Sequence, residues 1–110
     1  MSHYLLRFQF KDTTAKNLVA HPQDRTAPAR SLVEGFGGKL NSYYFCFGEY
    51  DGVGIAEFPD NVSAAACSMT AASTGAFAKF ETMPLLTAKE AEAAMNMAKN
   101  AKTGYKPPNT

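Results

Sequence analysis

The chain has 110 residues, enough for one domain with a single core. Its 11 Lys and Arg against 10 Asp and Glu leave a formal net charge of +1 with no basic block, so nothing in it indicates a nucleic-acid or anionic-membrane surface. No stretch reaches the roughly 20 apolar residues of a bilayer-spanning helix, and no secretion signal begins the chain, so we expect a soluble, cytoplasmic protein.

The first predicted element is a strand over residues 4–10, where the side chains alternate between two faces. The more apolar face is made by Tyr4, Leu6, Phe8 and Phe10. The other face carries Leu5, Arg7 and Gln9. We therefore expect a strand that buries one side and keeps part of the other near solvent.

Two helical segments are predicted before the next strand. A short helical turn over residues 13–18 ends at His21-Pro22, because the residue before a proline is pushed out of the α region. The second helix begins either at Pro22, with a kink at Pro28, or near Thr26, which places Pro28 in its first turn. Its apolar stripe and left-handed stop are Ala29, Leu32, Val33, Phe36 and then Gly37-Gly38.

A β-hairpin is predicted from two apolar runs around a short polar turn. The strands cover residues 39–47 and 53–58. Between them, Asp51-Gly52 is typical of a type I′ turn, since both central residues of that turn need a positive φ. The turn would place Tyr50 and Asp51 at the tip of the hairpin.

Another helix and a fourth strand follow. Pro59 stops the third strand, and Asp60 or Asn61 is placed to cap the helix after it. The strand over residues 76–83 again alternates, and Pro84 closes it. We expect the inner stripe of the small-residue helix to be Val62, Ala65, Ala66 and Met69.

The last helix is predicted over residues 87–102. Thr87 and Glu90 form the Thr-x-x-Glu pattern of a capping box. Its weakly apolar stripe is Ala91, Ala94, Met95 and Ala98. We therefore divide the chain into a domain over residues 1–102 and an extended arm over residues 103–110, where Gly and Pro cannot continue the helix.

This order of elements predicts an α+β fold, the ferredoxin-like split βαβ arrangement with a four-stranded antiparallel sheet and helices on one face. The other face then lacks a cover. Because the strands carry apolar or aromatic side chains on both faces, a monomer would expose a large apolar patch. We expect a homodimer in which two sheets pack through their open faces into an α/β barrel.

Several motifs occur at fixed spacing along the chain: Gly37-Gly38-Lys39-Leu40, Tyr44, Gly48-Glu49-Tyr50-Asp51, Glu57, Pro59-Asp60 and Gly75. With these residues the chain resembles the GYD domain family, which is named for its Gly-x-Tyr-Asp turn. The resemblance extends from about Tyr4 to Met97 and departs from the family pattern at His21 and Pro28. It implies a dimeric ferredoxin-like α/β barrel and no particular reaction, since its wider fold relatives include oxygenases, haem-degrading enzymes, isomerase-like enzymes and ligand-binding proteins.

Tyr50, Asp51 and His3 are the candidate catalytic residues. A carboxylate beside a phenol in a dry pocket can be tuned toward neutral pH, so Asp51 could act as a base and Tyr50 as a proton donor. His3 is a second candidate base. The structural alternative, which we favour, is that Asp51 shapes the turn, Tyr50 packs at the rim and His3 is an exposed terminal histidine.

Arg7, Tyr43 and Tyr44 are the candidate ligand-binding residues. Arg7 needs a carboxylate such as Glu57 or Glu81 from a neighbouring strand or subunit, and without one it would bind a substrate anion. We favour the ion pair. Tyr43 and Tyr44 point to opposite faces of their strand, so one faces the helices and the other the dimer side or a cavity.

The leading hypothesis is a homodimer that binds a small apolar or aromatic molecule in a pocket between the sheet and the helices, bounded by Tyr44, Tyr50 and Asp51. The alternatives are a cofactor-independent oxygenase or isomerase and an assembly module without a pocket. We expect no cofactor and no metal, because the two histidines have no ligand neighbours at suitable spacing. Cys46 and Cys67 are expected to fill the core as thiols.

Overall fold

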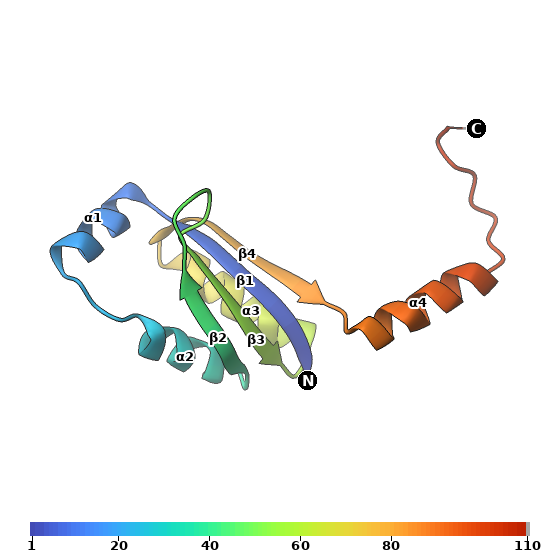
Figure 1. The fold of residues 1–110 in the computed structure, drawn as a ribbon, viewed down its shortest axis with the longest axis horizontal. Helices are drawn as coiled ribbons and strands as arrows, with labels where there is room; N and C mark the ends of the chain where they lie inside the picture. Colours follow the sequence, from blue (N-terminus) through green and yellow to red (C-terminus); the bar gives the residue numbers. More distant parts are fainter. Residues whose placement is uncertain (110) are drawn as a thin grey trace.

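The computed structural model describes residues 1–109 and contains one four-stranded antiparallel sheet. In space the strands follow the order β2-β3-β1-β4, which is the ferredoxin-like order and confirms the predicted fold class. Figure 1 shows the sheet with its helices. The strands are β1 (Ser2–Phe10), β2 (Lys39–Phe45), β3 (Gly52–Phe58) and β4 (Phe77–Leu85), and the helices are α1 (Asp12–Ala20), α2 (Thr26–Glu34), α3 (Asn61–Ser73) and α4 (Ala88–Asn100).

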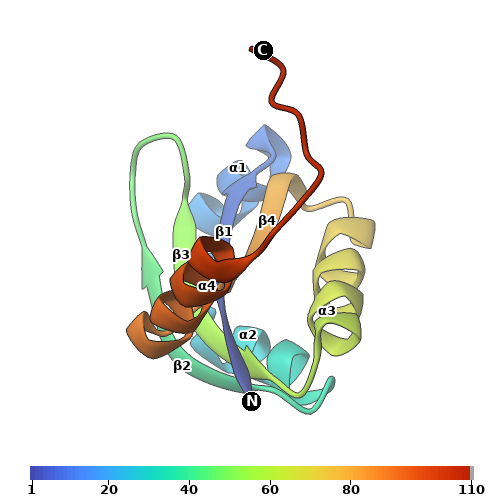
Figure 2. The same ribbon diagram turned by 90° about the vertical axis from the view of Figure 1, so that its right-hand side faces the viewer.

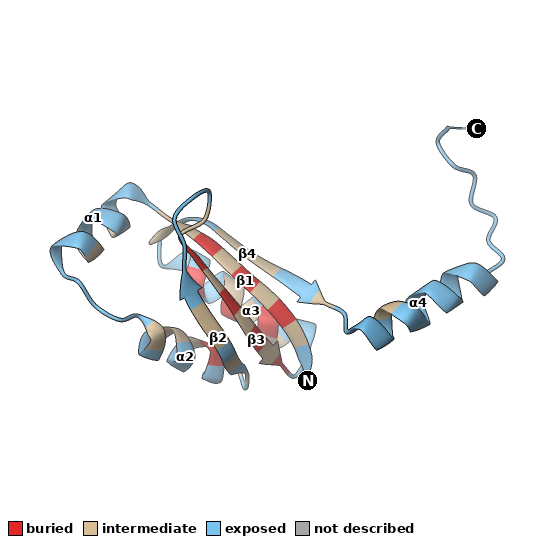
Figure 3. Ribbon diagram, in the orientation of Figure 1, coloured by how far each residue is buried: buried red, intermediate tan, exposed pale blue. Residues whose placement is uncertain are grey.

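The core lies on the sheet face that α2 and α3 cover. Figure 2 looks along the long axis and shows α3 beside β4 and α2 near β2. In β1 the predicted alternation holds, because Tyr4, Leu6 and Phe8 are buried while the residues between them are half-buried. Figure 3 shows the buried positions gathered on β1, β3, α2 and α3. The contiguous core is Tyr4, Leu6, Val33, Ala56, Phe58, Ala64 and Cys67.

The second helix begins at Thr26, so the alternative that places Pro28 in its first turn is confirmed. A proline at this point costs little, since the first-turn N–H groups have no partner within the helix. Asp60 caps α3 by accepting a hydrogen bond from the Ser63 N–H at 2.8 Å. Both helix starts therefore follow from local chain chemistry.

The predicted inner stripe of α3 is wrong. Val62 and Met69 are 79% and 70% exposed, and the buried residues are Ala64, Cys67 and Ala71. The helix has small residues around its whole circumference, so apolar periodicity does not distinguish its faces. Packing against the sheet decides the orientation, and it buries the face of Ala64, Cys67 and Ala71.

The predicted type I′ turn is also wrong. β2 ends at Phe45, and residues 46–51 form a longer connection closed by the Cys46 N–H donating to the Asp51 carbonyl at 2.9 Å. Among the described residues positive φ occurs at Gly37 and Gly75, not at Asp51 or Gly52. The connection leaves Cys46 exposed, which corrects its assignment to the core, whereas Cys67 is buried as predicted.

Pro84 does not end the fourth strand. It lies within β4 and pairs with Tyr4 of β1. β4 is an edge strand, so a proline can be accommodated there with its missing N–H on the unpaired side. The strand consequently runs on to Leu85.

Helix α4 has the predicted capping box and projects away from the sheet (Figure 1). The Thr87 N–H donates to Glu90 Oε1 at 2.9 Å, and the Glu90 N–H donates to Thr87 Oγ1 at 3.0 Å. No residue of α4, all of which are described, is buried. Residues 101–109 form no helix or strand, and Thr110, the end of the predicted arm, lies outside the described residues. Within residues 1–109 no helix combines the length and apolar character needed to span a bilayer.

Candidate functional site

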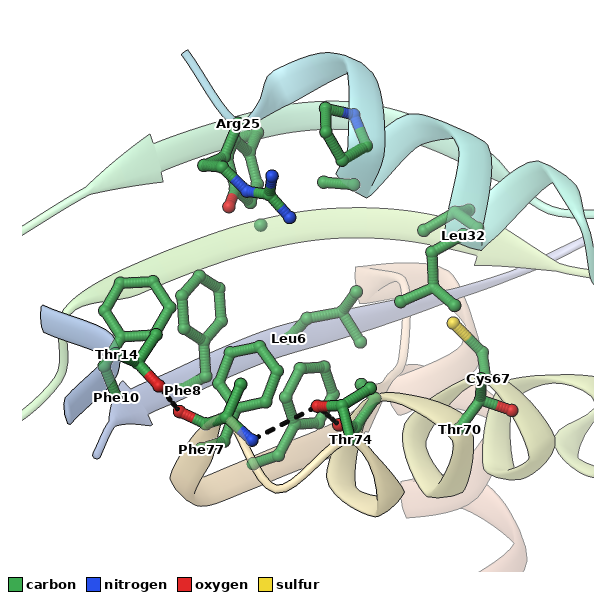
Figure 4. Close-up of a pocket in the computed structure, with 18 of the residues that line it drawn as sticks. Leu6, Phe8, Phe10, Thr14, Arg25, Leu32, Cys67, Thr70, Thr74 and Phe77 are labelled. Carbon is green, nitrogen blue, oxygen red and sulfur yellow. Dashed lines mark hydrogen bonds between the residues drawn. The ribbon is translucent and has the colours of Figure 1, made fainter. Parts of the chain in front are cut away.

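A cavity of about 460 Å³ lies between the covered face of the sheet and helices α1, α2 and α3. Figure 4 shows its walls. Its floor comes from the buried face of β1, together with β2 and β4, and its roof comes from the three helices. Most of the lining is apolar: Leu6, Phe8, Phe10, Leu18, Pro28, Ala29, Leu32, Val33, Leu40, Tyr43, Cys67, Ala71, Ala76, Phe77 and Phe80.

Aromatic rings from three strands meet around Phe8 at one end of the cavity. The Phe8 ring centroid lies 5.3 Å from those of Phe10 and Phe77, and its ring stacks on Phe80 at 5.9 Å and on Tyr43 at 6.2 Å. Side chains two residues apart share a strand face, and cross-strand pairing then brings Phe80 opposite Phe8. These rings can pack against an aromatic or aliphatic ligand.

Cys67 and Leu32 lie at the other end of the cavity (Figure 4). Cys67 is 1% exposed, and burial raises the pKa of its thiol to about 11. A thiol with this pKa stays protonated near neutral pH and is a poor nucleophile. Cys67 therefore contributes an apolar wall.

The threonines that line the cavity donate their hydroxyl protons to backbone carbonyls. Thr14 donates to Ala76 at 2.7 Å and Thr74 donates to Ala71 at 2.7 Å. Thr70 donates to the Ala66 carbonyl at 2.8 Å, within α3. These hydroxyls thus line the wall without offering a free donor to a ligand.

Tyr43 lines this cavity, so it is the one of the two neighbouring tyrosines that faces the helices. It lies opposite Gly54 on the covered face, whereas Tyr44 lies opposite Val53 on the open face and is 67% exposed. Burial raises the pKa of Tyr43 above its ordinary value, with a smaller opposing effect from Arg25. The prediction that the two tyrosines face opposite sides of the sheet is confirmed.

Tyr50 lies on the open face, so it does not bound the cavity. Its hydroxyl donates to Glu81 Oε1 at 2.8 Å, and the Arg7 guanidinium carbon lies 4.5 Å from its ring centroid. The hydrogen bond to Glu81 raises the pKa of Tyr50 above its ordinary value, and burial adds to this effect. A phenol with a raised pKa, paired to a carboxylate, is a structural donor at neutral pH.

Arg7 is paired as predicted. Its Nε donates to Glu81 Oε2 at 2.8 Å across neighbouring strands. Hydrogen bonds from Tyr50 and then from Arg7 hold the pKa of Glu81 below its ordinary value. Arg7 is therefore occupied on the open face and does not line the cavity.

Asp51 holds the hairpin connection against β1. Its Oδ2 accepts a hydrogen bond from the Phe10 N–H at 2.7 Å, and its own N–H donates to the Phe8 carbonyl at 2.8 Å. These bonds extend the pairing with β1 from Gly52, the first residue of β3, back into the hairpin connection. The geometry matches the structural role of Asp51 rather than that of a base facing the cavity.

His3 lies far from Tyr50. Its Nε2 lies 3.8 Å from Glu57 Oε1. His3 is four residues along β1 from Arg7, the neighbour of Tyr50, and this separation is about 13 Å at strand spacing. The structure thus does not bring His3, Tyr50 and Asp51 into one catalytic group. The described residues also contain no cluster of three His, Cys, Asp or Glu side chains suited to a metal ion.

Among the predicted site residues Tyr43 lines the cavity, whereas Tyr44, Tyr50 and Asp51, which are predicted to bound the pocket, do not. Tyr44 lies in β2 and Tyr50 and Asp51 lie in the connection that follows it, and a turn motif does not reveal on which face of the sheet each side chain lies. Arg25, at the cavity mouth, was missed. Its one sequence signal is a cation directly before a helix that covers the sheet.

The chain was compared with known proteins. The model of the family described as GYD domain matches residues 4–95, most of the 110 residues. This range ends close to Met97, where the resemblance based on sequence motifs also ends. No curated protein matches the chain.

Proposed function

The chain belongs to the GYD domain family, and on that premise we propose that it is a homodimeric α/β barrel that binds a small apolar or aromatic molecule. The observation that carries the ligand is the cavity of about 460 Å³ beneath α1, α2 and α3. Ligand pockets generally have volumes of about 300–1,000 Å³ and mainly hydrophobic walls. The proposed binding site is this cavity.

The size and lining of the cavity support a ligand over a module packed solid. Protein interiors contain few voids larger than a water molecule, because wall atoms without neighbours lose dispersion contacts. The Phe8, Phe10 and Phe77 rings leave apolar surface facing this space. An apolar ligand would restore those contacts, whereas water would find few polar partners along this wall.

The open face of the sheet supports a second copy as the partner. At its centre Leu5 lies between Ile55 on β3 and Met83 on β4. Val53 lies on the same face of β3, two residues from Ile55. Ion pairs flank this apolar centre at Arg7–Glu81 on one side and His3–Glu57 on the other. An apolar centre within a polar rim is the usual composition of a protein interface.

The ligand proposal can be tested by narrowing the cavity. Ala71 lines it and is 2% exposed, whereas its neighbour Ala72 is exposed on α3. We expect native mass spectrometry and organic extraction of the purified protein to recover a small molecule from the wild type. Ala71→Leu should reduce the recovered amount at least about tenfold, since its larger side chain enters the cavity. Ala72→Leu should retain the wild-type amount.

Cys67 provides an independent readout of occupancy. In a Cys46→Ser background the remaining thiol faces the cavity, so a bound molecule should slow its reaction with a disulfide reagent. Extraction of the ligand should restore the faster rate. Equal labelling rates before and after extraction, together with equal recovery from both leucine variants, would contradict binding in this cavity.

A further inference from the structure

Arg25 is the one formally charged side chain among the described residues that line the cavity. It is the N-cap residue of α2 and is exposed to solvent. In Figure 4 its guanidinium points from the start of α2 toward the space above Leu6. The cavity therefore has an apolar interior and a single cation at its mouth.

The charge of Arg25 is not neutralised within the described part of the chain. The ion pairs there join His3 to Glu57, Arg7 to Glu81 and Lys79 to Glu49. Arg25 donates one hydrogen bond, from Nη1 to Gln23 Oε1 at 2.9 Å. A guanidinium has five N–H donors, so most of its donor capacity is left for a ligand.

Asp24, the neighbouring carboxylate, is directed elsewhere. Its Oδ1 accepts a hydrogen bond from the Thr26 N–H at 2.8 Å, at the start of α2. Asp24 is also absent from the described residues that form the cavity wall. It reduces the local positive potential but does not occupy the guanidinium.

From this arrangement, and resting on the proposed ligand-binding function, we infer that the cavity selects a monocarboxylate with an apolar or aromatic tail. The planar guanidinium of Arg25 binds the carboxylate through two N–H donors, and the tail lies among Phe8, Phe10 and Phe77. A single cation matches a single negative charge, whereas a phosphate dianion would need further cations. The lining threonine hydroxyls donate to backbone carbonyls, so Arg25 supplies the charged contact, beside the neutral polar groups of Asn17, Gln23 and Tyr43.

Matched acids and alcohols test the inference. Two probe pairs are used, 4-phenylbutyrate with 4-phenylbutan-1-ol and decanoate with decan-1-ol, and within each pair the acid and the alcohol have the same tail. Binding is measured by calorimetry at neutral pH on ligand-free protein. We expect wild type to bind each acid about tenfold more tightly than its alcohol, as the loss of one charged hydrogen-bonding partner predicts. Arg25→Gln should remove this preference and leave alcohol binding unchanged, and Arg25→Lys should retain part of it.

Arg30→Gln is the matched control, since Arg30 is exposed on the same helix and does not line the cavity. It removes the same charge and should keep the acid preference, which excludes a general electrostatic effect. Equal affinity for acid and alcohol in the wild type, or an unchanged preference in Arg25→Gln, would overturn the inference while leaving ligand binding intact. No binding of either member of either pair, with no molecule recovered from the purified protein, would overturn the proposed function as well.

Discussion

The ring of Phe8 lies against the backbone of Gly52, where no other residue would leave room for it. A Cβ placed on Gly52 would overlap the ring, with Phe8 Cε1 2.6 Å away. Gly52 is opposite Phe8 in the pairing of β1 and β3. Gly52, which directly follows the Gly48-Glu49-Tyr50-Asp51 motif, is thus needed for close packing beside the cavity and not for a turn with positive φ.

Gly52→Ala is therefore expected to destabilise the protein. The added methyl group must displace Phe8 from its aromatic neighbours, so the free energy of unfolding should fall by about 1–3 kcal/mol. Urea denaturation measures this change. Gly48→Ala, in the connection just before Gly52, is the control, since a Cβ there meets no atom within 4 Å, and it should stay within about 0.5 kcal/mol of wild type. Equal stability of the two variants would contradict the packing role.

The dimer should depend on the centre of the open face. Ile55→Lys places a charge beside Leu5 at this centre, so it should convert a species of twice 11.9 kDa into one of 11.9 kDa in sedimentation velocity. Val62→Lys, on the exposed side of α3, should leave the dimer intact. A wild-type protein that sediments as a monomer at high micromolar concentration would exclude this interface.

Acid should weaken the fold partly through Glu81. Its pKa is held below the ordinary value of 4.5, first by the Tyr50 hydrogen bond and then by that of Arg7. A carboxyl group whose pKa is lower in the folded state adds stability above its unfolded pKa, and this stability is lost as the pH falls through the folded pKa. Stability should therefore decrease from about pH 4.5 downward, and less steeply in Glu81→Gln.

Carbon-detected NMR titration of Glu81 gives the direct check. The wild-type pKa should lie below 4.5, and Tyr50→Phe should raise it, because the phenol hydroxyl no longer donates to the carboxylate. An unchanged Glu81 titration in Tyr50→Phe would show that this hydrogen bond is absent in solution.

Asp51 should affect stability and not ligand binding. Asp51→Ala removes the acceptor of the Phe10 N–H, which should lower the free energy of unfolding by about 1–3 kcal/mol. Asp51→Asn keeps an acceptor oxygen and should lose less. Thermal unfolding and calorimetry with decanoate separate the two roles. Weaker ligand binding without a loss of stability would assign Asp51 to the site instead.

Local patterns were sufficient for most of the secondary structure. The alternation in β1, the Asp60 cap of α3 and the Thr87–Glu90 capping box depend on residues within one turn or one strand, so they can be recognised without knowing the fold. The ion pair of Arg7 was also predicted, because a cation on a strand face needs a carboxylate nearby, but only the structure selects Glu81 over Glu57 as its partner. The α3 stripe could not be recognised, since small residues surround that helix.

The sequence by itself determined the order of elements, the ferredoxin-like sheet and the family, because these follow from periodicity, caps and motif spacing along the chain. Only the tertiary structure decided which side of the sheet each site residue faces. Tyr43 and Tyr50 are close in sequence, yet Tyr43 lines the cavity and Tyr50 lies with Glu81 on the open face. Cross-strand register and the path of the 46–51 connection determine the face on which each side chain lies. Both depend on packing between segments far apart in the chain.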